Sequence, residues 1–147
     1  MAATIQPHAV AAARSGLTQA LAGMRPPGED IEDRAPVWDY MQNFWMDTDP
    51  SILLPEVARI CAESKYSLEE LEAIFWNEVR PAVSFNMAML PAPEWAGFEI
   101  EWLKERVLRK SRYGKPLPRK WLHPYSSNWW RRLQAGIVQR RGIQSAS

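Results

Sequence analysis

The sequence has a single cysteine, Cys61, and only two histidines, His8 and His123. One thiol forms no disulfide within the chain, and these three side chains cannot complete a four-ligand zinc site. We therefore expect no metal and no other cofactor. A lone cysteine is also typical of a reducing compartment, so we expect a cytoplasmic protein.

Long apolar runs and catalytic motifs are missing as well. Charges or prolines interrupt the apolar stretches every few residues, whereas a membrane-spanning helix needs about 20 apolar residues. There is no nucleophile elbow, P-loop, dinucleotide fingerprint, HExxH or EF-hand loop. His123 precedes Ser126 and Ser127, but proximity in sequence does not make a catalytic triad. We expect neither a membrane span nor an enzyme.

Acidic side chains are nearly absent from both ends of the chain. Residues 1–28 hold two arginines and no acid, and residues 104–147 hold 12 bases against Glu105 alone. Residues 29–103 hold 16 acids against four bases, so the total of +1 conceals a net charge of −12 in the middle. Either the basic end folds onto the acidic middle, or one of the two surfaces binds a partner of opposite charge.

These shifts divide the 147 residues into three segments. Residues 1–28 are rich in alanine and end in a proline- and glycine-containing cluster, which predicts a flexible N-terminal arm. Residues 29–111 form the expected acidic helical core domain. Residues 112–147 form a basic, tryptophan-rich segment that packs on the core or extends it.

Hydrophobic periodicity predicts an all-α fold, with four to five short helices in a compact bundle. We expect helices over about 34–46, 68–80 and 98–111, and a basic C-terminal helix over about 128–142. A second helix is expected to start near Pro55 and to place Val57, Ile60 and Cys61 on one side. Residues 82–97 contain prolines and few charges, which predicts one long irregular crossing loop.

Several residues mark the expected helix boundaries. Asp33 is the expected cap of the first helix, with Pro36 near its start. Ser67 and Glu70 form a capping box at the start of the third helix, and we expect Pro81 to end that helix. Pro55 is expected near the start of the second helix. A cap at Ser126, Ser127 or Asn128 is expected for the last helix, which ends near Gly142.

Asp47 and Asp49 stand two residues apart, directly before Pro50. Two carboxylates at this spacing could hold a divalent cation. At a helix entrance, however, carboxylates are more typical of caps and of partners of the helix dipole. We favour the caps, and we expect no metal site.

Eight tryptophans are present, and they divide into two groups. Five fall on or beside the helical stripes, which favours core packing: Trp38, Trp45, Trp76, Trp95 and Trp102. The other three alternate with bases in the set Arg119, Lys120, Trp121, Trp129, Trp130, Arg131 and Arg132. Such a pattern indicates either stacking on nucleic-acid bases or a helix that lays its tryptophans on the acidic body.

Three motifs carry a resemblance: an R-x-PVW opening at Arg34, a YSLEELE helix followed by EV-x-P, and an EW-x-GF-x-x-x-WL close. With them, residues 33–110 resemble a small bacterial domain family of unknown function. The resemblance implies a bacterial, helical, cytoplasmic protein and no catalytic residue. The matching positions include Arg34, Pro36, Trp38, Tyr66, Leu71, Glu78, Pro81, Asn86, Trp95, Gly97, Phe98, Trp102 and Leu103.

A small acidic domain without catalytic groups is similar in type to immunity proteins that neutralise secreted toxins. We therefore expect a protein-binding domain whose acidic helical face meets a basic partner such as a toxin. The expected contact residues, with Trp76 as an anchor, are Asp47, Asp49, Glu69, Glu70, Glu72, Trp76 and Glu78. The alternative is a nucleic-acid-binding accessory protein that uses the basic tryptophan-rich segment.

Overall fold

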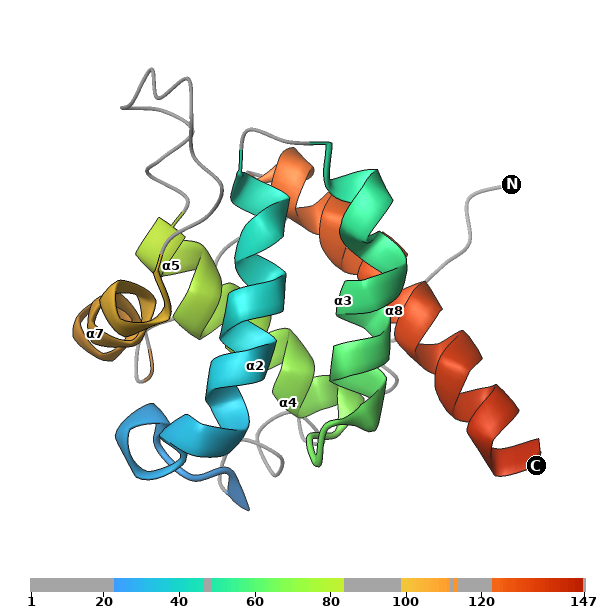
Figure 1. Ribbon diagram of the computed structural model, residues 1–147, viewed down its shortest axis with the longest axis horizontal. Coiled ribbons are helices and arrows are strands. Elements are labelled where there is room, and N and C mark those ends of the chain that lie inside the picture. The colour runs from blue at the N-terminus through green and yellow to red at the C-terminus, as the bar shows by residue number, and fades with distance from the viewer. Residues whose placement is uncertain (1–22, 47–48, 84–98, 112, 114–122, 147) are drawn as a thin grey trace, which may run out of the picture.

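The computed structural model describes residues 23–46, 49–83, 99–111, 113 and 123–146, and every regular element in these ranges is helical (Figure 1). The expected all-α bundle is confirmed. In chain order the elements are η1 (Pro27–Glu29), α2 (Ile31–Met41), η2 (Gln42–Trp45), α3 (Pro50–Glu63), α4 (Leu68–Ala73), η3 (Ile74–Val79), α5 (Arg80–Val83), α7 (Ile100–Lys110) and α8 (Pro124–Ala146). Most of the predicted N-terminal arm and nearly all of the predicted crossing loop lie outside the described residues.

The helices surround one core. α2 and α3 pack together in the front of Figure 1, and the run formed by α4, η3 and α5 lies behind α2. α7 flanks this body on one side and packs on α2, whereas α8 packs on α3 on the other side. The last turns of α8 extend away from the other helices (Figure 1), and residues 142–145 are accordingly exposed.

α2 begins earlier than predicted. Its N-cap is Asp30 rather than Asp33, and Pro36 lies inside the helix instead of at its start. The side chain of Asp30 makes no capping hydrogen bond, because its carboxylate binds Lys65 and Tyr66. The capping pattern at Asp33 therefore predicted the wrong start for α2. The carboxylate of the actual N-cap, Asp30, bonds to residues distant in sequence instead of capping the helix.

α3 begins at the predicted cap. The Asp49 carboxylate accepts hydrogen bonds from the Ser51 backbone N–H at 3.0 Å and from the Ser51 hydroxyl at 2.8 Å. Pro50 occupies the first turn, where a missing N–H costs nothing, and Pro55 lies inside the helix rather than near its start. Asp47 lies outside the described residues. The cap interpretation of Asp49 is confirmed.

The helical run from α4 to α5 contradicts the predicted stop at Pro81. The capping box of Ser67 and Glu70 is present, as predicted, but helical structure continues through Pro81 to Val83. The segment just before Pro81 is the π-helix η3, in which Arg80 N–H bonds to the carbonyl of Phe75. In a π-turn, a backbone N–H bonds to the carbonyl five residues earlier instead of four. This shift lessens the loss of backbone hydrogen bonding that proline causes in an α-helix.

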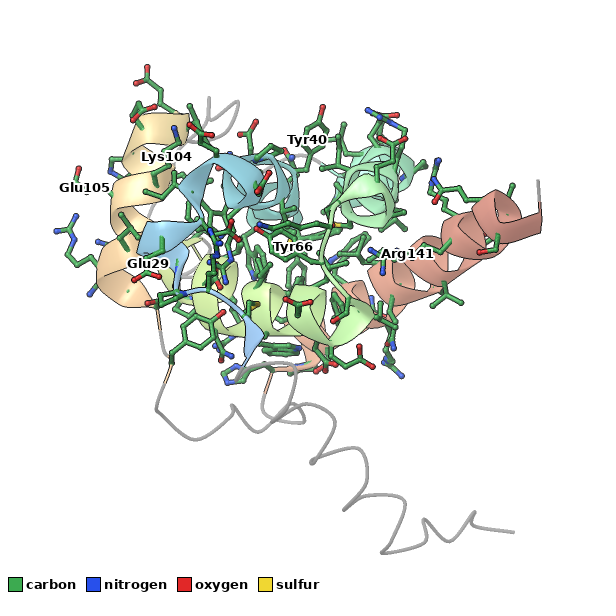
Figure 2. All side chains as sticks on the ribbon, turned by 90° about the horizontal axis from the view of Figure 1, so that it is seen from below. Glu29, Tyr40, Tyr66, Lys104, Glu105 and Arg141 are labelled. Atoms are coloured by element: carbon green, nitrogen blue, oxygen red, sulfur yellow. The ribbon has the colours of Figure 1, made fainter. Side chains whose placement is uncertain are left out.

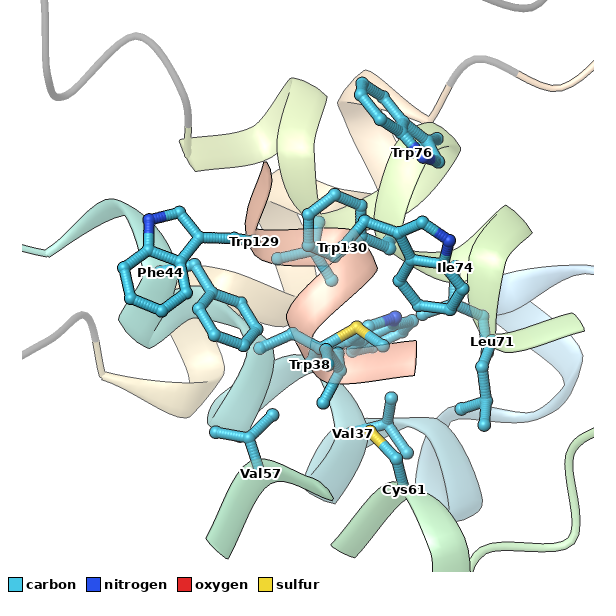
Figure 3. Close-up of a cluster of buried hydrophobic side chains, with 14 of the residues drawn as sticks. Val37, Trp38, Phe44, Val57, Cys61, Leu71, Ile74, Trp76, Trp129 and Trp130 are labelled. Atoms are coloured by element: carbon cyan, nitrogen blue, oxygen red, sulfur yellow. The ribbon is translucent and has the colours of Figure 1, made fainter. Parts of the chain in front are cut away.

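Aromatic side chains from helices distant in sequence fill the core (Figure 3). Trp129 of α8 stacks on Phe44 of η2, with ring centroids 5.5 Å apart. The rings of Trp130 of α8 and Phe75 of η3 pack together with their centroids 5.4 Å apart. The basic C-terminal segment thus contributes a helix to the core, although part of that segment, residues 112 and 114–122, lies outside the described residues.

α8 differs from its prediction at both ends and crosses α3 closely. It starts at Pro124 and continues past Gly142 to Ala146. A single glycine costs a helix only about 1 kcal/mol, which does not stop it. At the crossing, a Cβ placed on Gly136 would lie 3.0 Å from the Cβ of Ala58. Gly136 therefore permits an approach that a larger residue would hinder.

Candidate functional site

The acidic residues predicted on the third helix do not form one exposed row. Glu69 is exposed on α4, whereas Glu70 and Glu72 are half-buried. The Glu70 carboxylate is also committed to the capping box, because it accepts a hydrogen bond from the Ser67 backbone N–H at 3.1 Å. Glu69 is thus the best placed of these three acids to meet a partner.

Trp76 and Glu78, two of the predicted partner-binding residues, are not on the surface. Trp76 is 1% exposed and Glu78 is 0% exposed, so their assignment as an anchor and a rim charge is wrong. The reason is that neighbours cover η3 on several sides, with α2 and α7 both packed against it. All six residues of η3 are buried, and helical periodicity could not indicate this.

Glu78 lies at the centre of a buried polar cluster. Its Oε1 accepts a hydrogen bond from Trp38 Nε1 at 2.8 Å and lies 3.4 Å from Arg34 Nε. Its Oε2 accepts a hydrogen bond from the Tyr113 hydroxyl. Burial raises the pKa of Glu78, while Arg34, Tyr113 and Trp38 partly oppose that rise. We call these four residues the Glu78 centre.

Arg34 supplies the positive charge of the Glu78 centre and is itself fully buried. Its Nη2 donates to the Arg25 carbonyl at 2.6 Å, and its guanidinium lies 5.7 Å from the centroid of the Tyr66 ring. Its Nη1 has no hydrogen-bond acceptor in the part of the chain that the structure describes. Its Nε likewise makes no hydrogen bond there, although it lies near Glu78, and a buried charge with two such donors is costly. The Glu78 carboxylate offsets part of this cost.

A second buried carboxylate, Asp30, joins the start of α2 to the residues before α4. The Tyr66 hydroxyl donates to Asp30 Oδ2 at 2.5 Å, and Lys65 Nζ donates to Oδ1 at 2.7 Å. Burial raises the pKa of Asp30, but the hydrogen bonds from Lys65 and Tyr66 outweigh it and lower this pKa overall. Asp30 therefore holds two parts of the fold together as a carboxylate.

The outward sides of α2 and α3 carry five acids outside the predicted partner-binding set. Outward positions on α2 follow the spacing 32, 36 and 39, and those on α3 follow a similar spacing at 52, 56, 59 and 63. Lys65 follows α3, and its Nζ lies 2.9 Å from the Asp33 carboxylate at the start of α2. Because the end of α3 is near the start of α2, the two helices are antiparallel neighbours. Figure 2 shows Tyr40 at the outer edge between them. We call this surface the α2–α3 face: Glu32, Asp33, Asp39, Ile52, Glu56, Arg59 and Glu63.

The α2–α3 face is negatively charged. Among the described residues, its five carboxylates outnumber the three nearby bases by two: Arg59, Lys65, and Arg140 of α8, which acts electrostatically on Glu56. Arg59 pairs with Glu56 at 2.9 Å and with Glu63 at 3.0 Å, and its hydrogen bond lowers the pKa of Glu56. Ile52 lies at one end of the face and is 77% exposed. The face thus combines excess negative charge with one exposed apolar side chain.

The residues of the nucleic-acid alternative divide into three groups. Trp129 and Trp130 are buried, so the assignment of these two to base stacking is wrong: both pack in the aromatic core. Arg131 and Arg132 are exposed on α8, and the Arg132 guanidinium lies 4.9 Å from the centroid of the Trp129 ring. The remaining three, Arg119, Lys120 and Trp121, lie outside the described residues.

The described ranges carry neither a metal-binding cluster nor a reactive thiol. No group of three His, Cys, Asp or Glu side chains in these ranges could hold a metal ion. Burial raises the pKa of the Cys61 thiol to about 12, which keeps it protonated and unreactive at neutral pH. Each described helix is too short or too polar to traverse a bilayer.

Comparison with known families identifies the family of this chain. The family model described as a domain of unknown function, DUF7079, matches residues 32–140. The chain belongs to this family. No curated protein and no solved structure matches the chain. The resemblance inferred from residues 33–110 is therefore confirmed as membership of a domain family of unknown function, and the DUF7079 match extends through most of α8.

The structure brings together positions that define the resemblance. Arg34 and Trp38 from the R-x-PVW motif meet Glu78 from the EV-x-P motif in the Glu78 centre. Tyr66, which opens the YSLEELE helix, packs beside Arg34. Residues of the R-x-PVW, YSLEELE and EV-x-P sequences thus meet around the buried Arg34, whereas the α2–α3 face uses mainly residues outside these sequences.

Proposed function

We propose that this DUF7079 domain is a non-catalytic protein-binding domain of the bacterial cytoplasm. Its partner is a basic protein, and the partner type that we favour is a secreted toxin that the domain neutralises as an immunity protein. The observation that supports the proposal is the α2–α3 face, where five carboxylates outnumber the nearby bases by two and Ile52 is exposed.

The physical logic of such a face is rapid capture followed by slower release. Excess negative charge steers a positively charged partner toward the surface and raises the association rate. Nuclease toxins suit this role, because a cleft that holds phosphates is positively charged. Ile52 adds an apolar contact whose burial slows dissociation. It takes the anchor role that was predicted for Trp76, because Trp76 is buried in the core.

The core position of the α8 tryptophans favours this proposal over nucleic-acid binding. Nucleic-acid binding by base stacking needs exposed aromatic rings, but Trp129 and Trp130 are 7% and 3% exposed. Arg131 and Arg132 remain exposed for phosphate contacts, which are weak and sensitive to salt without such stacking.

Two charge-reversed triple variants test the proposal. Glu32→Lys, Asp39→Lys and Glu56→Lys reverse the α2–α3 face. Glu29→Lys, Glu101→Lys and Glu105→Lys serve as the matched control, because they change the net charge equally at exposed acids on η1 and α7. Each protein is co-expressed with the product of a neighbouring toxin gene, and growth rescue and binding to the purified toxin are measured.

The two variants have opposite expected outcomes. The α2–α3 variant loses rescue and binds the toxin at least about tenfold more weakly, which corresponds to about 1.4 kcal/mol, whereas the control variant retains both. Equal behaviour of the two variants would contradict the assignment of the binding surface. Binding of single-stranded DNA that depends steeply on salt and is lost with Arg131→Glu and Arg132→Glu would favour the nucleic-acid alternative.

A further inference from the structure

A cavity separates the segment before η1 from the end of α7. Its volume is about 360 Å³, and the described residues that line it are Met24, Arg25, Pro26, Pro27, Ser111 and Tyr113. This volume falls within the range of roughly 300–1,000 Å³ that is typical of small-molecule sites. The cavity lies apart from the α2–α3 face, since none of its lining residues belongs to that face.

The cavity wall is linked directly to the Glu78 centre. Tyr113 lines the cavity and donates its hydroxyl hydrogen to Glu78. Arg25 also lines the cavity, and its backbone carbonyl accepts the hydrogen bond from Arg34 Nη2. Glu78 and Arg34 are therefore each one hydrogen bond away from a residue of the cavity wall. These two hydrogen bonds fix the positions of the Tyr113 side chain and of the Arg25 backbone.

The lining favours an anionic ligand with an apolar body. Met24, the two prolines and the Tyr113 ring provide apolar surface, and no described acid lines the cavity. Arg25 is exposed and forms no ion pair with another described residue. An arginine at the edge of an apolar pocket binds a carboxylate through charge-assisted hydrogen bonds.

We propose that this cavity binds a small apolar carboxylate. Arg25 binds the carboxylate group, and the apolar body packs against Met24, the two prolines and the Tyr113 ring. The Tyr113 hydroxyl is already a donor to Glu78, so Arg25 supplies the main charge recognition. This site is independent of the proposed toxin-binding surface.

Benzoate and benzamide are the probes for this site, because they share a shape and differ in charge. Each is titrated into the full-length ¹⁵N-labelled protein, and amide shifts are followed by NMR. We expect saturable shifts at Met24, Arg25, Ser111 and Tyr113 with benzoate, and affinity at least about tenfold weaker for benzamide. No saturable shift at these residues, or equal affinity for the two probes, would overturn the proposal.

Arg25→Ala tests the recognition residue without disturbing the Glu78 centre. The variant keeps the backbone carbonyl that accepts from Arg34, so the fold should be unchanged. We expect Arg25→Ala to weaken benzoate binding about tenfold and to leave the weaker benzamide affinity unaltered. The matched control is Arg109→Ala, which removes an exposed arginine of α7 outside the cavity and should bind benzoate like the unmodified protein. Unchanged benzoate affinity in Arg25→Ala would refute the role of Arg25.

Discussion

Glu78 and Glu56 both stand in helical segments and both pair with an arginine, but their surroundings are opposite. The side chains of Glu78 and Arg34 are 0% exposed, whereas those of Glu56 and Arg59 are 50% and 37% exposed. In the first pair, the loss of one member leaves a buried charge without compensation. In the second pair, water solvates whichever charge remains. The same type of ion pair therefore stabilises the fold at Glu78 and Arg34, whereas at Glu56 and Arg59 it leaves the charged side chains accessible to a partner.

Removal of the buried carboxylate should have the largest effect. Glu78→Ala leaves Arg34 buried without a counter-charge and deprives Trp38 and Tyr113 of their acceptor, so we expect a loss of about 3–5 kcal/mol in the free energy of unfolding. Urea denaturation followed by circular dichroism measures this loss. Glu56→Ala is the exposed control.

A double variant sharpens this result. Arg34→Met together with Glu78→Leu removes both charges and should recover part of the stability that Glu78→Ala loses, because no uncompensated charge remains. If Glu78→Ala were no more destabilising than Glu56→Ala, the distinction between the two regions would fail.

The Asp30 contact should show an intermediate effect with a defined pH dependence. Tyr66→Phe removes a hydrogen bond to a buried carboxylate, and we expect it to cost about 1.5–3 kcal/mol at pH 7. The folded-state pKa of Asp30 lies below the ordinary value of 3.8, so its contribution is complete above that pH and declines as the pH falls through the folded-state value. The raised pKa of Glu78 acts in the opposite sense, because its protonation favours the folded state.

Asp30→Asn is the variant that isolates this pH dependence. Its free energy of unfolding, measured in urea between pH 2.5 and pH 7, should fall less on acidification than that of the unmodified protein. The free energy of unfolding of Glu78→Gln should fall more on acidification than that of the unmodified protein, because this variant lacks the group whose protonation opposes the decline. Identical pH profiles for the two variants would contradict the opposite pKa directions.

The exposed arginine should have the smallest effect. Arg59→Ala breaks its ion pairs with Glu56 and Glu63, but all three side chains remain in contact with water. We expect no resolvable change in the urea midpoint at 1 M NaCl and only a slight decrease at low salt. Because the variant makes the α2–α3 face more negative, we also expect tighter binding of a basic partner. A large loss of stability would show that the exposed pair is structural after all.

The sequence predicted those features that depend on neighbours along the chain. The capping box at Ser67, the Asp49 cap and the core position of Trp38 and Trp45 follow from spacing of three or four residues. The third predicted helix was recognised for the same reason, but its continuation through Pro81 was not. That continuation depends on a π-helix, which leaves no clear signal in residue type.

The candidate sites were harder to predict than the helices. Glu69 and Glu78 lie in one helical run and have the same chemical type, but only Glu69 is exposed. Spacing assigns residues to a helix face without showing how many other helices cover that helix. The periodic row at Glu32 and Asp39 was visible as the side opposite the apolar stripe, and closer attention to this pattern could have indicated the α2–α3 face.

The residue order alone determined that this chain is helical, that its charge is sorted into an acidic middle and basic ends, and that it belongs to the DUF7079 family. Only tertiary structure decided which charges are buried and that Trp129 and Trp130 of α8 belong to the core. Helix formation depends on contacts within a few residues, whereas burial depends on contacts between helices far apart in sequence. Arg34 and Glu78, 44 positions apart, form their pair only when α2 packs on η3.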